Sequence, residues 1–328
     1  MRKPYTYMVV DTETATLPFV NEITHDAEEK KKIAIAKPLI YDIGWTICNR
    51  RGDILGSKQY LVAETFSVPA VFNTAYYAEK RPIYLDKLAK KETTIKPWND
   101  IMEIFIADMQ TVDAVGAYNS MFDFKKALPF TELYISKLYS PDYYTWEARQ
   151  KTFCADIILN PRQPKKDDNF EPEIFRFRGE QYPLFDLWGL ATKVLLNNVS
   201  YKKNCLAHDL LSASGLYFKT SAETSYQYLS NKYDFVESHT ALDDAMIETF
   251  ILSKIARRHA ISIGIAYFPF RDLGETVEFV TRNKTVNLEE CEKVSNAIVA
   301  HLETKTKGSA YYVKMLNKLN YLNKRMGL

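Results

Sequence analysis

The stretch VVDTETAT, residues 9–16, begins as a buried strand and continues into two acidic residues. The apolar run YMVV that leads into Asp11 is typical of a strand covered on both faces, and the strand is expected to end at Asp11. Strand side chains alternate between faces, so Asp11 and Glu13 point the same way and Thr12 the other. Two carboxylates this close repel each other. The pair therefore needs a cation, a shared proton or open water, and a solvated strand end is the simplest alternative.

Length and composition limit the class of protein. A chain of 328 residues can form one large domain, or a domain with an appendage. With 46% hydrophobic and 26% charged residues it is expected to be globular, and a net charge of +2 excludes a polycationic coat protein but not a local basic groove. No apolar run approaches the roughly 18 residues of a membrane span, and acids interrupt the N-terminus, so we predict a cytoplasmic protein without a membrane partner. Heavy use of Lys, Asn, Tyr and Phe is typical of an AT-rich genome, which would place a virus-encoded protein in the host cytoplasm.

The cysteines do not form a recognisable site. They are scattered, without a CxxC spacing or a nearby histidine pair, at Cys48, Cys154, Cys205 and Cys291. Reduced, partly buried thiols are expected, not a zinc site or a disulfide framework.

The order of the predicted elements indicates an α/β fold. Residues 39–49 and 54–62 flank the turn RRGD and predict a hairpin. Further strands are expected at 113–119 and 151–159, with a helix opened by Pro97 between the hairpin and the first of them. We therefore predict a mixed sheet of about five strands flanked by helices.

Insertions and later helices complete the expected organisation. Long connections are expected near 18–38, 64–97 (with one short helix) and 160–183 (a loop). Helices should follow around 185–196, 203–214, 221–230 and 241–258. Residues 259–328 form a mostly helical C-terminal extension of unassigned role, with a short strand VEFVT and a basic, Tyr-rich tail. The tail either packs as a helix, which we favour, or interleaves aromatic and basic residues as single-strand binders do.

Four acidic segments look like helix caps. Capping boxes are predicted at Ser120/Asp123, Thr220/Glu223, Thr240/Asp243 and Asn287/Glu290. Asp244 differs from its neighbour Asp243. It heads the row Asp244, Ile247, Ile251 and Ile255, which has the spacing of a buried helical face. A carboxylate on a buried face should have a partner, and His239 lies just before the same helix, where a cap or surface position is the alternative.

Taken together, the motifs D-x-E, N-x-x-F-D and H-x-A-x-x-D resemble those of the DEDDh (DnaQ-like) 3′–5′ exonucleases of the ribonuclease H-like superfamily. The matching residues are Asp11 and Glu13; Asn119, Phe122 and Asp123; and His239, Ala241 and Asp244. The resemblance covers about residues 5–258, and we take residues 1–258 as an exonuclease domain. The acid before Ile43 and Gly44 also falls where the family commonly has one. Thr16 departs from the pattern, because the family usually has glycine there.

The resemblance implies catalysis by two Mg²⁺ or Mn²⁺ ions. Asp11, Glu13, Asp123 and Asp244 would be metal ligands, which answers why the first two are paired. His239 would be the general base. Thr14, Leu17, Asn119 and Phe122 would bind the terminal nucleotide, although core packing is the alternative for Phe122. Basic candidates for the substrate strand are Lys125, Lys126, Lys165, Lys166, Arg176, Arg178, Lys202 and Lys203.

The expected function is hydrolysis of single-stranded DNA from its 3′ end to nucleoside 5′-monophosphates. An exoribonuclease or oligoribonuclease is the alternative of the same class. A non-catalytic module that binds nucleic acid or a polymerase is the alternative of another class, with the C-terminal extension as the candidate attachment site for a replication or polymerase partner.

Overall fold

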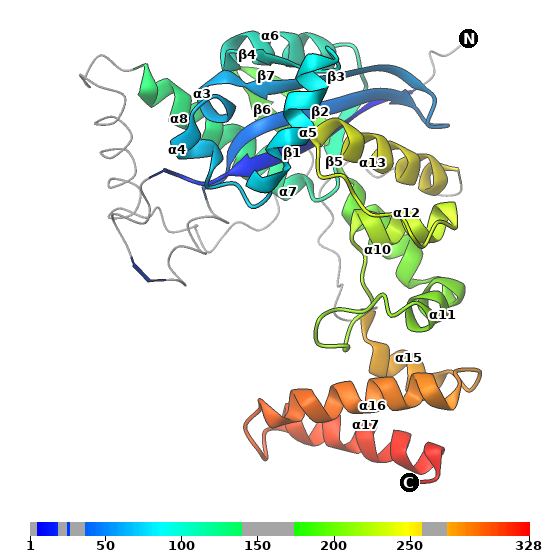
Figure 1. Cartoon of the computed structure of the whole chain (residues 1–328). Coiled ribbons are helices and arrows are strands. Elements are labelled where there is room, and N and C mark those ends of the chain that lie inside the picture. Colours follow the sequence, from blue (N-terminus) through cyan, green and yellow to red (C-terminus); the bar gives the residue numbers. More distant parts are fainter. Residues whose placement is uncertain (1–4, 19–24, 27–36, 140–173, 258–273) are drawn as a thin grey trace. The chain divides into compact units, whose positions relative to one another are not determined.

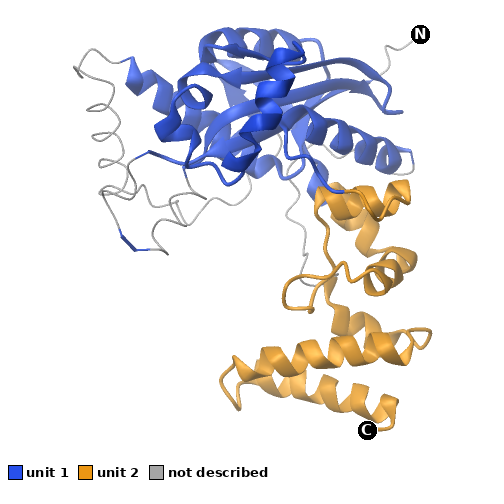
Figure 2. Ribbon diagram, in the orientation of Figure 1, with its two compact units in different colours: residues 1–189, 236–266 blue, residues 190–235, 267–328 orange. Residues whose placement is uncertain are grey.

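The computed structural model describes residues 5–18, 25–26, 37–139, 174–257 and 274–328. The chain divides into two compact units, each discontinuous in sequence (Figure 2). Unit 1 contains residues 1–189 and 236–266, and unit 2 contains residues 190–235 and 267–328. The contact-defined division therefore assigns residues 190–235 to the same unit as the C-terminal segment.

A seven-stranded mixed sheet forms the centre of unit 1 (Figure 1). Its order is β4-β3-β2-β1-β5-β7-β6. β1 pairs antiparallel with β2 and parallel with β5, β5 is parallel to β7, and β3 is antiparallel to β2. The strand bounds are β1 (Thr6–Ala15), β2 (Leu39–Asn49), β3 (Ile54–Val62), β4 (Thr94–Lys96), β5 (Ala114–Ala117), β6 (Ile174–Phe177) and β7 (Glu180–Asp186). This α/β arrangement is consistent with the ribonuclease H-like fold, with seven strands in place of the expected five.

Helices cover both faces of this sheet. On β2, the indole N–H of Trp45 donates to Asp108 of α6 (Trp98–Met109) at 2.8 Å. The next residue, Thr46, lies 2.5 Å from Thr249 of α13 (Ala241–Ala256), hydroxyl to hydroxyl. Neighbouring strand residues point to opposite faces, so α6 and α13 lie on opposite sides of the sheet. The other helical segments of unit 1 are α3 (Ala63–Phe66), α4 (Pro69–Phe72), η1 (Ala78–Lys80), α5 (Arg81–Ala89), α7 (Ser120–Phe122), η2 (Asp123–Ala127) and α8 (Leu128–Leu138).

In its described residues, the regular elements of unit 2 are helices joined by loops. Its helices are α10 (Leu187–Leu196, which starts in unit 1), α11 (Val199–Ala207), α12 (Ala222–Ser230), α15 (Thr276–Arg282), α16 (Leu288–Glu303) and α17 (Ala310–Met326). An isolated bridge between Tyr217 and Glu275 joins the two sequence segments of unit 2 through their backbones, and a second bridge, Leu211 to Phe218, lies within the first segment.

Several element predictions are confirmed. The hairpin strands have the predicted bounds, and α13 buries Asp244, Ile247, Ile251 and Ile255 as the spacing required. The basic tail is helix α17, whose buried residues are Met315, Leu319 and Leu322, whereas Tyr311 and Tyr321 are exposed. Cys48, Cys205 and Cys291 are free and buried, and Cys154 lies outside the described residues.

Other element predictions are wrong. β1 does not end at Asp11, because it stays paired with β2 through Ala15. VEFVT is part of helix α15, not a strand. Part of the predicted loop 160–183 forms β6 and β7, and the insertion 64–97 holds several short helices and β4. The strand expected at 151–159 lies outside the described residues.

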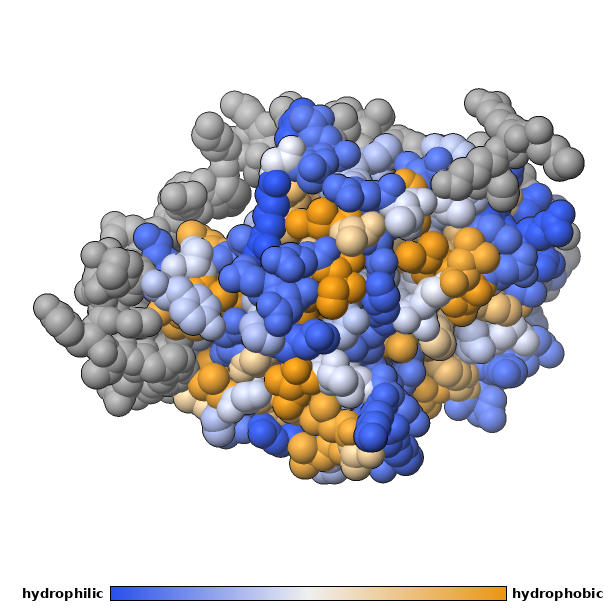
Figure 3. All heavy atoms as spheres, turned by 90° about the horizontal axis from the view of Figure 1, so that it is seen from above, coloured by the Kyte–Doolittle hydropathy of each residue, from blue (hydrophilic) through white to orange (hydrophobic). Residues whose placement is uncertain are grey.

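The surface of the described residues mixes polar and apolar side chains, as the face in Figure 3 shows. Across the described part of the chain, no helix has the length and apolar character needed to cross a membrane.

Candidate active site

The paired acids of β1 lie in the middle of the sheet. Asp11 pairs with Gly44 and Glu13 with Asp42, both on the antiparallel strand β2. Because β1 continues beyond them, neither acid is at a frayed strand end, and both side chains are half-buried. Solvation of a free strand end therefore does not explain the pair. A shift in strand register follows Glu13, which changes the course of β1 toward Thr14.

Helix α13 brings Asp244 onto the same part of the sheet. Asp244 is 7% exposed and lies in the first turn of the helix. Two residues of β2 hold this end of α13. The carboxylate of Asp42 accepts the backbone N–H of Ala241 at 2.9 Å, and a Cβ at Gly44 would overlap the backbone of Leu242. Glycine is thus required for the close approach of helix and strand.

Asp123 reaches the site from the segment that follows β5. It is 3% exposed and begins the π-helical turn η2. The hydroxyl of Thr12 donates to its Oδ1 at 2.6 Å, which ties it to β1. The predicted capping box with Ser120 does not form, because Ser120 Oγ donates to the carbonyl of Phe185 and accepts the backbone N–H of Ala117.

The residue next to Asp244 has a different environment. Asp243 accepts hydrogen bonds from Lys87 Nζ at 2.8 Å and from the hydroxyls of Ser238 and Thr240. The Lys87 ammonium and Thr240 hydroxyl outweigh the effect of burial and lower the pKa of Asp243 below its usual range. Thr240 precedes the first helical residue, but its side chain makes no bond to the helix backbone. The predicted capping box is therefore replaced by this ion-paired group.

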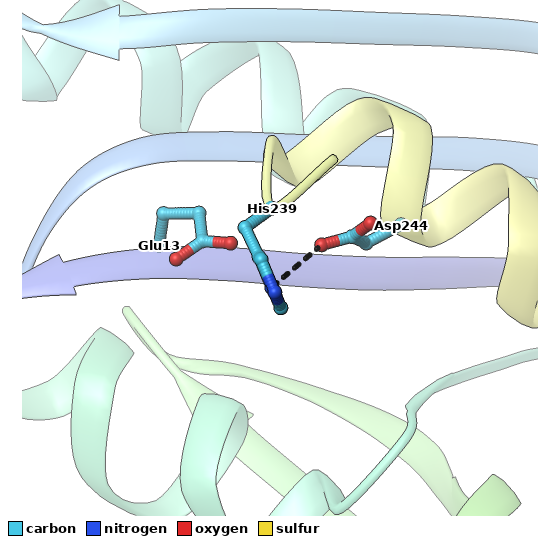
Figure 4. A group of neighbouring side chains, drawn as sticks. All are labelled: Glu13, His239 and Asp244. Carbon is cyan, nitrogen blue, oxygen red and sulfur yellow. Dashed lines mark ion pairs between the residues drawn. The ribbon is translucent and has the colours of Figure 1, made fainter. Parts of the chain in front are cut away.

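His239 lies between Glu13 and Asp244 (Figure 4). Its Nδ1 is 4.0 Å from Asp244 Oδ2 and 4.0 Å from Glu237 Oε2. One ligand atom from each of Glu13, His239 and Asp244 lies within 4.8 Å of the others. The backbone of His239 has φ of +53°, in the left-handed region that non-glycine residues seldom adopt. The histidine is thus part of the acidic cluster.

One acid of this cluster was missed by the sequence reasoning. Glu248 is 3% exposed and accepts the backbone N–H of Tyr118 at 3.1 Å. It lies one helical turn after Asp244, so a spacing of four residues on the same face was the signal that could have found it.

The acids raise one another's pKa values. Burial raises the pKa of Asp11 well above its usual range, and the charges of Glu248, Asp244, Asp123 and Glu13 raise it further. Burial, followed by the charge of Asp244, raises the pKa of Glu13 to about 9. Burial is also the main cause for Asp123, at about 7, and for Asp244, at about 8. The ionised forms of these five carboxylates repel one another, and a bound cation would relieve that repulsion.

The ligand atoms of the site also fit a metal ion, and this argument does not depend on the pKa values. Asp244 Oδ1 is buried and has no hydrogen-bond partner among the described residues, and a buried polar atom without a partner is costly. Glu13 and His239 offer further ligand atoms next to it. Carboxylate oxygens with one imidazole can bind a divalent cation.

The four residues expected to bind the terminal nucleotide differ in burial and in backbone conformation. Leu17 is fully buried in the core of unit 1, and Phe122 is partly buried against that core. Thr14 is half-buried on β1. Asn119 precedes α7 with a left-handed backbone, φ +77°. Among the basic candidates, Arg178 forms an ion pair with Glu132 in unit 1, Lys202 and Lys203 belong to unit 2, and Lys165 and Lys166 lie outside the described residues.

Comparison with known proteins returned no match from family models, from curated proteins or from solved structures.

Proposed function

We propose that this protein is a metal-dependent 3′–5′ exonuclease of the DEDDh type, which hydrolyses single-stranded DNA from its 3′ end and releases nucleoside 5′-monophosphates. The observation that carries the proposal is the convergence of Asp11, Glu13, Asp123 and Asp244 with His239, from three separate segments of unit 1. These are the residues that the three sequence motifs select.

The acids would hold the metal. Asp11, Glu13, Asp123 and Asp244 would bind two Mg²⁺ or Mn²⁺ ions, which prefer carboxylate oxygens. When bound, such ions polarise the scissile phosphate and the attacking water and stabilise the leaving 3′ oxygen. The pKa values of the acids are raised, and Oδ1 of Asp244 has no partner among the described residues. Both observations support a site that a bound cation would stabilise.

The chain's own groups would position the reactants and move the proton. His239 would accept the proton of the attacking water, since a neutral imidazole can do so near neutral pH. Asp42 and Gly44 fix the first turn of α13, so they set where Asp244 lies relative to β1. Accurate placement matters because misplacement by about 1 Å can lower a rate by about a hundredfold.

Two alternatives to the proposed DNA exonuclease can be tested in the same degradation assay. An exoribonuclease would use the same acids, so the RNA arm of the assay distinguishes it. A non-catalytic binding module would normally have lost an acid or the histidine, and all of them are present. A replication or polymerase partner that binds through residues 259–328, and a location in the cytoplasm, remain part of this proposal.

The decisive experiment is degradation of short 5′-labelled DNA and RNA of matched sequence. We expect DNA to shorten from its 3′ end in the presence of Mg²⁺ or Mn²⁺, with nucleoside 5′-monophosphates as products, and excess EDTA to stop the reaction. A strand with a blocked 3′ terminus should resist. Hydrolysis in EDTA by protein that elemental analysis shows to be metal-free would contradict the proposal.

His239→Ala is the sharpest variant for this assay. We expect turnover to fall by roughly 10²–10⁴, the usual contribution of a general base, with the metal still bound by the acids. His208→Ala, at a histidine of unit 2, is the matched control and should keep wild-type turnover. Near-normal turnover of His239→Ala would show that the imidazole is not the base.

A further inference from the structure

The insertion between β3 and β4 contributes an aromatic ring that covers His239. Tyr77 stacks on the imidazole with ring centroids 4.1 Å apart and planes only 14° from parallel. Tyr77 is half-buried, and it belongs to residues 64–97, to which the sequence motifs assign no role. A parallel stack restricts the tilt of the smaller ring.

The same insertion also holds the backbone around His239. The hydroxyl of Tyr84 donates to the carbonyl oxygen of His239 at 3.2 Å. Lys80 Nζ donates to the carbonyl oxygen of Ser238 at 2.7 Å and lies 4.7 Å from the centre of the Tyr77 ring. The ring and backbone of the histidine segment are therefore contacted by residues within one short stretch.

The backbone of His239 needs this support. A residue other than glycine with φ of +53° occupies a conformation that persists where surrounding contacts enforce it. The imidazole also lies among like-charged acids, with Nδ1 4.0 Å from both Asp244 and Glu237. Other side-chain rotamers would carry the ring away from Glu13 and Asp244, and the stack with Tyr77 opposes them.

We propose that Tyr77 is a positioning residue, which holds the imidazole of His239 in the orientation needed to accept a proton from the attacking water. This inference rests on the exonuclease function proposed above and adds a residue that the catalytic motifs do not contain. The stacking face of the ring is required, whereas the phenol hydroxyl is not.

Tyr77→Ala and Tyr77→Phe separate these parts. We expect Tyr77→Ala to lower kcat on a DNA oligonucleotide by about tenfold to a hundredfold, as for a misoriented catalytic group, with KM changed little. Tyr77→Phe keeps the ring and should retain wild-type kcat. The control is Tyr76→Ala, which removes an 85% exposed ring that meets Tyr77 edge-on; its kcat should stay at the wild-type value. Equal losses for Tyr77→Ala and Tyr77→Phe, or no loss for either, would overturn the proposal.

A double-mutant cycle tests whether Tyr77 acts through His239. In a His239→Ala background, Tyr77→Ala should cause no further loss of kcat, because the group that it orients is gone. Full additivity of the two losses would show that Tyr77 acts through another route.

A spectroscopic readout separates this inference from the proposed function. The ring current of Tyr77 should shift the imidazole C–H proton resonances of His239, which can be assigned by comparison with His239→Gln. These resonances should move in Tyr77→Ala and keep their positions in Tyr77→Phe. If the wild-type protein hydrolyses no nucleic acid but the resonances behave this way, the exonuclease function fails and the stack stands. If hydrolysis is present and the resonances are the same in all three proteins, only the positioning role fails.

Discussion

The carboxylate of Asp42 accepts the backbone N–H of Ala241 at 2.9 Å, so a residue of β2 satisfies the N-terminus of the helix that carries Asp244. The same carboxylate accepts two hydrogen bonds from Gln59 Nε2, at 2.8 and 3.0 Å, and is fully buried. Strand and helix are therefore joined at the point where the acids of β1 and α13 meet.

Asp42→Asn should destabilise the protein and misplace Asp244. An amide in this position turns one acceptor into a donor that faces the donors of Gln59 and Ala241, which costs about 1–3 kcal/mol. Urea unfolding at constant pH measures this cost, and the assay on DNA measures the loss of turnover. Asp86→Asn, at an exposed ion pair with Lys90, is the control and should leave stability nearly unchanged. Equal stability of the two variants would contradict a structural role for Asp42.

Gly44→Ala should separate α13 from the sheet. The added methyl group would overlap the backbone of Leu242, and relief of such overpacking typically costs about 1–3 kcal/mol. We expect a lower thermal midpoint and weaker Mn²⁺ binding, because Asp244 moves with the helix. Gly56→Ala on β3 is the matched control, since a Cβ there meets no atom within 4 Å. The prediction fails if both alanine variants bind Mn²⁺ like the wild type.

Asp244→Asn should abolish hydrolysis, whereas Asp243→Asn should leave it unchanged. Asp244→Asn removes a buried acid of the cluster and should abolish turnover and weaken metal binding in calorimetry. Asp243→Asn should keep turnover and lose about 1 kcal/mol or less of stability, because its partner Lys87 forms a partly exposed ion pair and not a helix cap. An inactive Asp243→Asn with an active Asp244→Asn would show that the other carboxylate faces the site.

The metal-free protein should become less stable as the pH rises. The pKa values of Glu13, Asp123 and Asp244 are raised to about 9, 7 and 8, so each acid favours the folded state while protonated and loses that contribution as the pH rises through its folded value. In EDTA, the melting temperature should therefore fall between pH 6 and pH 9.

Divalent cations should reverse this trend, because they bind the deprotonated acids. Added Mg²⁺ or Mn²⁺ should raise the melting temperature more at pH 9 than at pH 6, measured by differential scanning fluorimetry in matched buffers. Asp244→Asn should show a smaller cation effect. A cation effect that is larger at pH 6 would contradict the cluster as the binding site.

The sequence predicted those parts of the fold that depend on local pattern. The turn RRGD and the two segments that flank it defined both strands of the β2–β3 hairpin, and the three-and-four spacing identified Asp244 as a buried residue of α13. The capping box at Asn287 and Glu290 also forms as predicted. Each of these features is decided by residues close together in the chain.

Most of the features that the sequence mispredicted depend on distant partners. Two of the predicted capping boxes are absent because distant groups compete: Asp243 binds Lys87, and Ser120 bonds with Phe185. A third is absent because the neighbouring residue Ser221 caps α12 in place of Thr220. Glu248 had a local signal, its spacing of four residues from Asp244 on the buried face of α13, but its position beside Asp11 depends on the fold. The strand β7 was missed because no local pattern of alternating polar and apolar residues indicates its pairing with β5.

The order of the acids along the chain has a consequence during synthesis. Asp11, Glu13 and Asp123 precede residues 190–235 of unit 2, and α13 with Asp244 and Glu248 follows them. A ribosome must therefore synthesise residues 190–235 before the last acids of the cluster emerge. Until then the cluster lacks the two carboxylates of α13. A nascent or prematurely terminated chain thus lacks part of the acidic cluster, and any cation site that the cluster forms is completed late in translation, by a single helix.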